Sequence, residues 1–217
     1  MDLGTHHHVH RPGRADDAPT LLLLHGTGAD ERDLLPLGEL LDPGASVLSP
    51  RGNVREAGMP RWFARHAEGV LDEEDVVRRA HELADWIAVA TEHYDLDPTR
   101  VVAAGFSNGA NIAAAVLLLR PEVLRAAALF APMVPLRPSE RVDLSATHVF
   151  VSAGRRDPIC PPEQVEELVG MLTDRDAAVE LTWHDGGHQL TREHAEAARA
   201  WLRTWQATTA TDPAALP

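Results

Sequence analysis

The feature of this 217-residue sequence that most constrains its fold is the alternation of short apolar runs with helix-like patterns. Most of these runs are apolar throughout rather than at every second residue, which is typical of strands covered by helices on both faces. An α/β fold with a mostly parallel central sheet and helices on both faces is therefore predicted. The strands are expected at residues 20–24, 46–49, 101–104, 126–130, 148–152 and 179–183, with a further edge strand near 6–11.

Helical patterns fill the intervals between the predicted strands. A stripe of apolar residues at helical spacing runs from Val76 to Ile87, and this helix should end before Asp97. Residues 108–119 are apolar nearly all round and predict a deeply buried helix, which Pro121 closes. Two further helices are expected around residues 165–172 and at 192–205.

The remaining segments suggest how the chain is organised. Residues 50–71 and 131–146 show no periodic pattern, and loops of this length are usually functional or disordered. The length fits one domain with its core at about 18–206, and nothing suggests internal repeats. Residues 207–217 have little to bury, and a mobile tail is predicted there.

Composition excludes several classes of function. The net charge of −13 opposes binding to nucleic acid or to an anionic membrane surface. All 20 basic residues are arginine, so Schiff-base and phosphate-loop lysine chemistry are excluded. A single cysteine, Cys160, excludes an internal disulfide and suits a reducing compartment. No run reaches the roughly 18 apolar residues of a membrane span, and no secretion signal is apparent, so a cytoplasmic protein is expected.

Three consecutive histidines at residues 6–8 also require an interpretation. We interpret them as polar side chains on an edge strand. A surface metal site and part of a purification tag are the alternatives.

The segment GFSNG at residues 105–109 has the G-x-S-x-G pattern of a nucleophile elbow, with Ser107 at its centre. The pattern alone is weak, but here it lies between a predicted strand and a predicted buried helix, as an elbow must. The alternative is that Ser107 merely caps the helix, since serine is a good N-cap.

An acid and a base follow Ser107 in the order expected for this architecture. Asp157 comes after the strand predicted at 148–152, and His188 comes after the last strand. Both should therefore lie with Ser107 at the carboxyl edge of the sheet. Asp157 could instead be a turn former before proline. His184 competes with His188, although the glycines before His188 favour the latter.

Acyl chemistry also needs hydrogen-bond donors for the developing oxyanion. The backbone N–H of Asn108, directly after the proposed nucleophile, can supply one. The glycine-rich loop at residues 24–30 can supply a second, and the N–H of Thr27 is the candidate. A simple glycine-rich turn is the alternative, because the loop matches neither a phosphate-loop nor a dinucleotide fingerprint.

The segments LLLLHGTGAD, GFSNGANIA, SAGRRDPICPP and GGHQL resemble, in this order, the signature blocks of the phospholipase/carboxylesterase family of α/β-hydrolases, which includes acyl-protein thioesterases. The resemblance covers roughly residues 18–206. The stretch RGNVREAGMPRWFARHAEGVLDEEDV is most similar to the bacterial subgroup of the hydroquinone-induced hydrolase. One departure is that the elbow reads SNG where many members have SQG.

The family resemblance implies a role for each motif residue. Ser107 would be the nucleophile, His188 the base and Asp157 its orienting partner, with Thr27 and Asn108 forming the oxyanion hole. It further implies a hydrolase with little or no cap, and often a homodimer. The serine chemistry itself requires no metal and no cofactor, so none is expected.

The long loops suggest a substrate pocket. Trp62, Phe63 and Met133 are predicted to line an apolar acyl cleft, since large aromatics on a polar loop usually cover something. The alternative is that these loops simply cover the sheet. Cys160 has no activating cation in the sequence, and we interpret it as a packing residue.

The expected function is a serine hydrolase that cleaves carboxylic esters or thioesters through an acyl-enzyme, with a small-molecule ester as its partner. The alternatives are a hydrolase of lactones or quinone-derived substrates, and a non-catalytic ligand sensor on the same fold.

Overall fold

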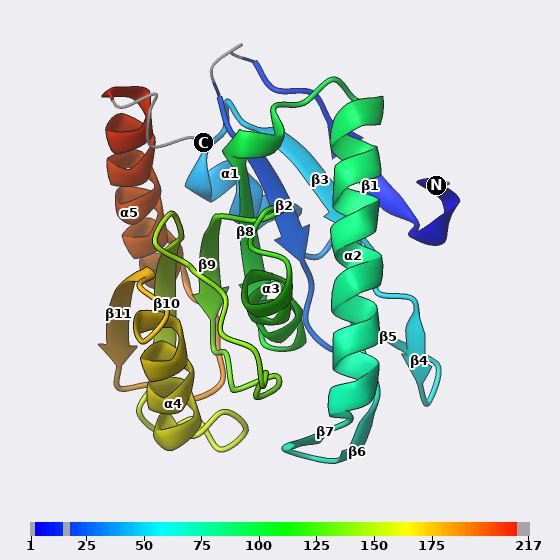
Figure 1. The fold of residues 1–217 in the computed structure, drawn as a ribbon, viewed down its shortest axis with the longest axis vertical. Helices are drawn as coiled ribbons and strands as arrows, with labels where there is room; N and C mark the ends of the chain where they lie inside the picture. Colours follow the sequence, from blue (N-terminus) through cyan, green and yellow to red (C-terminus); the bar gives the residue numbers. More distant parts are fainter. Residues whose placement is uncertain (1–2, 15–17, 212–217) are drawn as a thin grey trace.

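A seven-stranded sheet forms the centre of the structure, a computed structural model that describes residues 3–14 and 18–211 (Figure 1). The strands lie in the order β1-β3-β2-β8-β9-β10-β11. The edge strand β1 is antiparallel to β3, and all the other pairs are parallel. Their bounds are β1 His8–Arg11, β2 Thr20–Leu24, β3 Ser46–Pro50, β8 Val101–Phe106, β9 Ala126–Phe130, β10 His148–Gly154 and β11 Ala178–His184. The predicted mostly parallel sheet is thereby confirmed.

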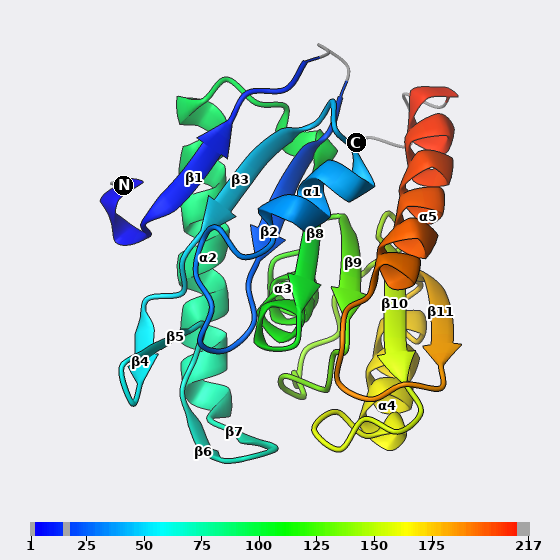
Figure 2. The same ribbon diagram turned by 180° about the vertical axis from the view of Figure 1, so that it is seen from behind.

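Helices cover both faces of the sheet. Helices α2 (Glu73–His93), α3 (Asn108–Leu119) and α4 (Pro162–Thr173) lie on the face toward the viewer in Figure 1. Helices α1 (Leu35–Leu41) and α5 (Arg192–Thr211) cover the opposite face (Figure 2). Strand side chains alternate between the two layers. In β2, Leu22 and Leu24 join the core under α2, α3 and α4, while Leu21 and Leu23 join the core under α1 and α5.

Two helices differ from the prediction. Helix α1 was not predicted, because its seven residues are too few for a periodic stripe. Helix α5 continues to Thr211, so residues 207–211 of the predicted mobile tail are helical instead. Threonine hydroxyls bond to carbonyls of the preceding turn there, from Thr208 to Thr204 at 3.0 Å and from Thr209 to Trp205 at 3.0 Å. The rest of the predicted tail, 212–217, lies outside the described residues.

The two long loops behave differently from each other. Residues 50–71 contain two short hairpins, β4 (Val54–Glu56) with β5 (Met59–Arg61), and β6 (Arg65–Ala67) with β7 (Val70–Leu71). The first hairpin turns through Ala57 and Gly58, both at positive φ, as a tight two-residue turn requires. Residues 131–146 contain neither helix nor strand. Short 3₁₀ turns at Leu3–Thr5 and Pro98–Arg100 complete the described elements.

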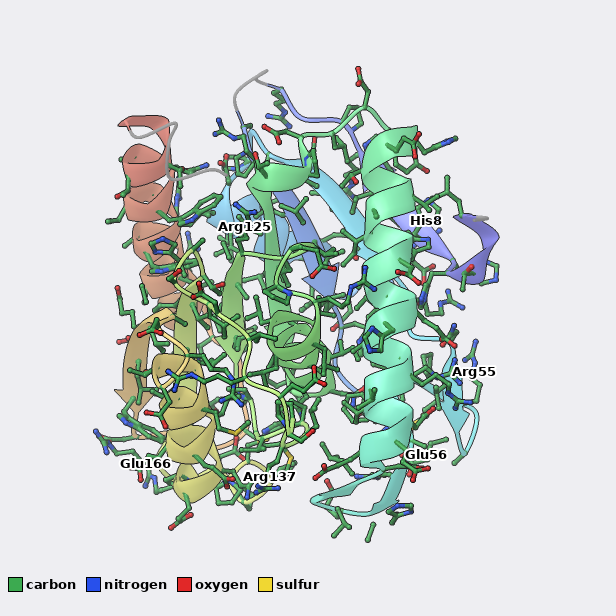
Figure 3. The ribbon with its side chains drawn as sticks, viewed as in Figure 1. His8, Arg55, Glu56, Arg125, Arg137 and Glu166 are labelled. Carbon is green, nitrogen blue, oxygen red and sulfur yellow. The ribbon has the colours of Figure 1, made fainter. Side chains whose placement is uncertain are left out.

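The histidines near the N-terminus are tied into the fold. Nδ1 of His6 lies 2.8 Å from the Arg51 carbonyl oxygen, and Nε2 of His8 lies 2.7 Å from the Tyr94 hydroxyl. His8 also packs edge-on against Trp86 of α2 (Figure 3). Of the three histidines interpreted as edge-strand residues, only His8 lies in β1; His6 and His7 precede the strand, and His6 is buried.

Among the helices of the described residues, none is both long and apolar enough to cross a membrane.

Candidate active site

Ser107 lies at the turn between β8 and α3. Its backbone has φ 53° and ψ −114°, in a region that L-residues seldom adopt, and its N–H donates to the Phe130 carbonyl at 2.8 Å. The hydroxyl makes no capping hydrogen bond to α3. The structure therefore disfavours the helix-cap alternative, and the serine has the strained strand-to-helix turn of a nucleophile elbow.

The two glycines of the motif allow the elbow to form. A Cβ added to Gly105 would lie 2.5 Å from the Gly109 carbonyl oxygen, so α3 packs directly against β8. A Cβ on Gly109 would lie only 1.8 Å from the Leu24 carbonyl oxygen. Both positions require glycine because backbone approaches backbone there, and this contact seats the first turn of α3 at the sheet edge.

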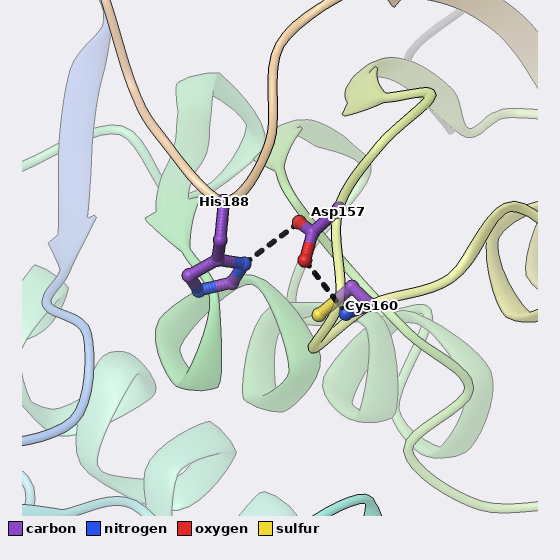
Figure 4. Close-up of side chains that lie close together, drawn as sticks. All are labelled: Asp157, Cys160 and His188. Atoms are coloured by element: carbon purple, nitrogen blue, oxygen red, sulfur yellow. Dashed lines mark hydrogen bonds and ion pairs between the residues drawn. The ribbon is translucent and has the colours of Figure 1, made fainter.

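The side chains of Ser107, His188 and Asp157 are brought together although the sequence separates them widely. The Ser107 hydroxyl lies 2.9 Å from Nε2 of His188. Nδ1 of His188 lies 2.7 Å from Oδ2 of Asp157, as Figure 4 shows. The other carboxylate oxygen of Asp157 accepts the backbone N–H groups of Ile159 at 2.8 Å and Cys160 at 2.9 Å. The Asp157 side chain is fully buried, so hydrogen bonds fix its position and satisfy both oxygens.

This geometry determines what the imidazole can do. In the neutral imidazole, Nδ1–H of His188 can donate to the Asp157 carboxylate, and Nε2 is then the acceptor that faces the hydroxyl of Ser107. The ring of Phe106 covers the imidazole, with 5.1 Å between ring centroids. An unprotonated Nε2 in this position can take the proton of the serine hydroxyl.

The loop after β11 carries His188. Gly186 and Gly187 come directly before it, and neither has a positive φ. Gly154 at the end of β10 allows this loop to pack closely, because a Cβ there would lie 2.5 Å from the Gly187 carbonyl oxygen. His184 is engaged elsewhere, since its Nδ1 accepts the N–H of Gly186 and its ring stacks on His194 at 3.9 Å. His188 is therefore the histidine that meets Ser107.

The two predicted oxyanion donors both lie beside the serine. Thr27, Ser107 and Asn108 line one small cavity. Asn108 is the first residue of α3, so its backbone N–H has no partner within the helix. Next to Thr27, Gly28 has φ +83° and donates its N–H to the Pro60 carbonyl at 2.9 Å, which fixes the course of the loop.

The structure corrects two of the three predicted pocket residues. Trp62 and Phe63 are buried in the core under α2 and α3, and they line none of the spaces that open on Ser107 or His188. These aromatic side chains do cover an apolar surface, as expected, but that surface is the core and not a substrate cleft. Met133 does line the cavity beside Ser107.

The shorter side chain of Asn108 has a structural role. Its Oδ1 accepts the backbone N–H of Trp62 at 2.8 Å, and Nε1 of Trp62 in turn donates to the carbonyl of His25 at 2.9 Å. The Asn108 side chain of the SNG motif therefore joins the elbow, through Trp62, to the loop that carries Thr27.

His25 is a site residue to which we assigned no role from the sequence. Its side chain is buried; Nδ1 donates to the Gly26 carbonyl at 2.7 Å, and Nε2 accepts the N–H of Gly52 at 3.0 Å. Only the neutral ring can make both bonds. A histidine directly after a buried strand, at the start of the glycine-rich loop, was the available signal.

Acidification is expected to destabilise the protein through His25. Burial is the largest effect on this imidazole and lowers its pKa from the ordinary 6.5. The unfolded chain therefore binds a proton near pH 6.5 that the folded protein binds only at lower pH, so stability is lost as pH falls below 6.5. Urea unfolding at about pH 7.5 and about pH 5 should show a loss of up to roughly 2 kcal/mol from this residue.

Two variants separate this effect from general acid sensitivity. His25→Gln should be less stable at neutral pH yet lose less stability on acidification. His81→Gln, which changes an exposed histidine on α2, should respond to pH as the wild type does. If His25→Gln and wild type lost equal stability on acidification, the pKa of His25 would not be lowered.

Among the described residues, one group of side chains has ligand atoms close enough together to surround a metal ion. Ligand atoms of Asp157, Cys160 and His188 all lie within 4.8 Å of one another (Figure 4). A thiol binds metal as the thiolate, but burial raises the pKa of Cys160 to about 12. The Asp157 and His188 side chains are also bonded to each other. The donor set therefore fits a metal poorly, and Cys160 packs as a neutral thiol.

The parallel sheet and the elbow, with the acid and the histidine on later loops at the same edge, define an α/β-hydrolase. The chain belongs to the dienelactone hydrolase family, whose sequence profile matches residues 51–211.

Similar proteins agree with this assignment. The chain is 49% identical over 196 residues to the putative hydrolase MhqD of Bacillus subtilis (strain 168), covering 90% of this chain and 97% of that protein. It is 47% identical to the crystal structure of a Bacillus cereus carboxylesterase, with a TM-score of 0.90 and coverage of 92% and 94%. A probable inactive carboxylesterase of Oryza sativa subsp. japonica is 28% identical over 202 residues, 87% of this chain and 76% of its own. The resemblance to carboxylesterases drawn from the motifs is confirmed, and the chain is a hydrolase-family protein.

Proposed function

We propose that the protein is a serine hydrolase that cleaves carboxylic esters through an acyl-enzyme. The observation that carries this proposal is the continuous hydrogen-bond chain from the Ser107 hydroxyl through His188 to Asp157, at 2.9 and 2.7 Å. It lies beside the backbone N–H groups of Thr27 and Asn108. Membership of a hydrolase family supports the same reaction class.

In the proposed first half-reaction, Oγ of Ser107 attacks the ester carbonyl carbon while Nε2 of His188 takes the hydroxyl proton. The carbonyl oxygen becomes an oxyanion, which the N–H groups of Thr27 and Asn108 stabilise. Asp157 holds the imidazolium in place without taking its proton. When the tetrahedral intermediate collapses, the bond to the alcohol oxygen breaks and His188 returns the proton to that oxygen.

The second half-reaction repeats these roles with water. Nε2 of His188 takes a proton from water, whose oxygen attacks the acyl carbon and displaces Oγ of Ser107. The serine regains its proton from the imidazolium, and the carboxylic acid leaves. The proposed steps require no metal or cofactor.

A cyclic ester is the second candidate substrate, because the matched family takes its name from the hydrolysis of a lactone. The chemistry at Ser107 would be the same, with the alcohol remaining attached to the acyl group. A thioester would also follow this path. The non-catalytic alternative is disfavoured, because the three side chains are present and hydrogen-bonded.

Covalent labelling tests the proposal. A fluorophosphonate should add one adduct by intact mass to the wild type and to Ser139→Ala, which changes an exposed serine far along the loop after β9. Ser107→Ala should take none. Turnover of 4-nitrophenyl acetate, a lactone and a thioester would then rank the substrate types. An adduct that persists in Ser107→Ala, or its absence from the wild type, would contradict the assignment.

A further inference from the structure

Three connected spaces meet at the proposed catalytic side chains. Ser107 and His188 both line a central cleft of about 340 Å³. On the His188 side lies a groove of about 520 Å³, lined by α1 and by the loop that follows His188. On the far side of Ser107 lies a cavity of only about 30 Å³. The groove and the cavity on the two sides of the cleft therefore differ widely in size.

The reaction geometry assigns one substrate half to each space. His188 must protonate the oxygen of the leaving alcohol, so the alcohol departs on the His188 side. The groove is lined by His188 but not by Ser107. The small cavity is lined by Ser107, Thr27 and Asn108, which contact the carbonyl, and not by His188. The groove therefore belongs to the alcohol and the cavity to the acyl group.

The groove has a lining of apolar side chains beside polar ones. Leucine side chains from α1 and from the residues just before it form one wall, Leu190 belongs to the opposite wall, and Phe106 lies at the junction with the cleft. Leu37 and Leu40 are the α1 leucines. These apolar walls can remove apolar surface of an alcohol from water, while Asp33, Gln189, Thr191 and Arg192 supply the polar part of the lining.

Buried groups form part of the wall of the acyl cavity. Asn111 and Met133 line it, and the backbone N–H of Met133 donates to Oδ1 of Asn111 at 2.9 Å. The buried thiol of Cys160 forms another part of the wall. A volume of this size holds a water molecule or a very short alkyl chain.

Two arginines also line the acyl cavity, but both are already paired. Nη1 of Arg61 donates to Glu56 at 2.7 Å, and Nε of Arg65 donates to the other oxygen of Glu56 at 2.9 Å. Arg65 also pairs with Glu68, which lines the cavity with it. Because these charges are compensated, a carboxylate on the acyl group would have to displace an existing partner.

We infer that the substrates are esters of a short, uncharged acyl group with a bulky apolar alcohol, for which the groove between α1 and Leu190 is the binding site. This inference rests on the proposed function, since it takes the roles of Ser107 and His188 from it. The structure thus places selectivity mainly in the alcohol.

Two substrate series test the inference on the wild-type enzyme. The first varies the acyl group of 4-nitrophenyl esters from acetyl through butyryl to octanoyl. We expect kcat/KM to fall by at least about tenfold from acetyl to octanoyl. The second varies the alcohol of acetate esters from ethyl to 2-naphthyl, and the naphthyl ester should have a KM at least about tenfold lower.

Variants at the two walls test the assignment of each space. Leu190→Trp fills the groove and should raise KM for 2-naphthyl acetate about tenfold with little effect on ethyl acetate. Met171→Trp, on α4 and outside all three spaces, is the matched control and should leave both KM values near wild type. Met133→Ala enlarges the cavity and should raise kcat/KM for octanoyl relative to acetyl esters about tenfold. Thermal unfolding verifies that each variant is folded.

The outcomes distinguish this inference from the proposed function. Fluorophosphonate labelling of Ser107 depends on neither substrate series. If Ser107 is labelled but octanoyl esters are preferred, or Leu190→Trp affects ethyl and naphthyl acetates equally, the inference is overturned and the proposed function stands. If Ser107 is not labelled and no ester is cleaved, both are overturned.

Discussion

Replacing Ser107 with alanine is expected to lower kcat for a short-chain aryl ester by roughly 10⁴- to 10⁶-fold, with little change in KM. The reason is that the hydroxyl would form the bond to the acyl carbon, and no other hydroxyl lies against Nε2 of His188 among the hydrogen bonds of the described residues. His188→Ala should lower kcat by a similar factor, because without the base the hydroxyl is a weak nucleophile. Initial rates with 4-nitrophenyl acetate measure both effects.

The double variant gives a sharper test than either single one. If Ser107 and His188 act as one unit, Ser107→Ala/His188→Ala should be no slower than either single variant, because the second change removes nothing that still functions. Asp157→Asn should have a kcat lower by roughly 10⁴-fold, since an amide can no longer hold the same tautomer of His188. Multiplicative losses in the double variant would mean that the two residues act independently. Ser139→Ala should retain wild-type rates.

Loss of activity in these variants should not reflect loss of the fold. The Ser107 hydroxyl makes no bond to the helix that follows it, and the His188 side chain keeps 16% of its surface exposed. Removing either therefore leaves no large cavity in either core. Unfolding midpoints within a few degrees of wild type are expected for both.

The strands and the buried helix could be predicted from the sequence because their signals are local. Strands β2 and β9 begin and end where their apolar runs do, at Thr20–Leu24 and Ala126–Phe130. Helix α3 matches its predicted bounds because an uninterrupted apolar segment lies between the elbow and Arg120. The order of Ser107, Asp157 and His188 was readable for a related reason, because parallel strands bring the loops after them to one edge of the sheet.

The environment of Trp62 could not be predicted, because it depends on contacts between segments far apart in the chain. Its backbone bonds to Asn108 and its indole to His25. Asn108 is the first residue of α3 and His25 lies in the loop after β2, and no periodic pattern links them to Trp62. The sequence indicates that this aromatic covers something, but only the packing of these three segments determines that it lies in the core and not in the substrate cleft.

The end of α5 shows a second limit. Beyond Trp205 the helix contains mainly alanine and threonine, which give no apolar stripe. In this part of the helix, threonine hydroxyls donate hydrogen bonds to carbonyls of the preceding turn. A search for apolar stripes in the sequence does not detect such bonds.

Gly109→Ala is expected to destabilise the protein by roughly 3–5 kcal/mol, measured as the free energy of unfolding in urea. The added methyl would lie 1.8 Å from the Leu24 carbonyl oxygen and 2.7 Å from that of His25. Real contacts of this kind stay beyond 3.0 Å, so the start of α3 or the end of β2 must move by more than an ångström. Both are backbone, which cannot rotate away as a side chain could.

Gly170→Ala is the matched control, because it makes the same change inside α4 at a position with no atom within 4 Å of the new methyl. It should stabilise the protein by about 0.5–1 kcal/mol, since alanine is the better helix former. If the free energy of unfolding falls in Gly109→Ala but rises in Gly170→Ala, the requirement for glycine after the nucleophile comes from the close approach of α3 to β2 and not from helix propensity. If Gly109→Ala cost less than about 1 kcal/mol, α3 would not be seated against β2 as described, and the position of Ser107 two residues earlier would lose its structural explanation.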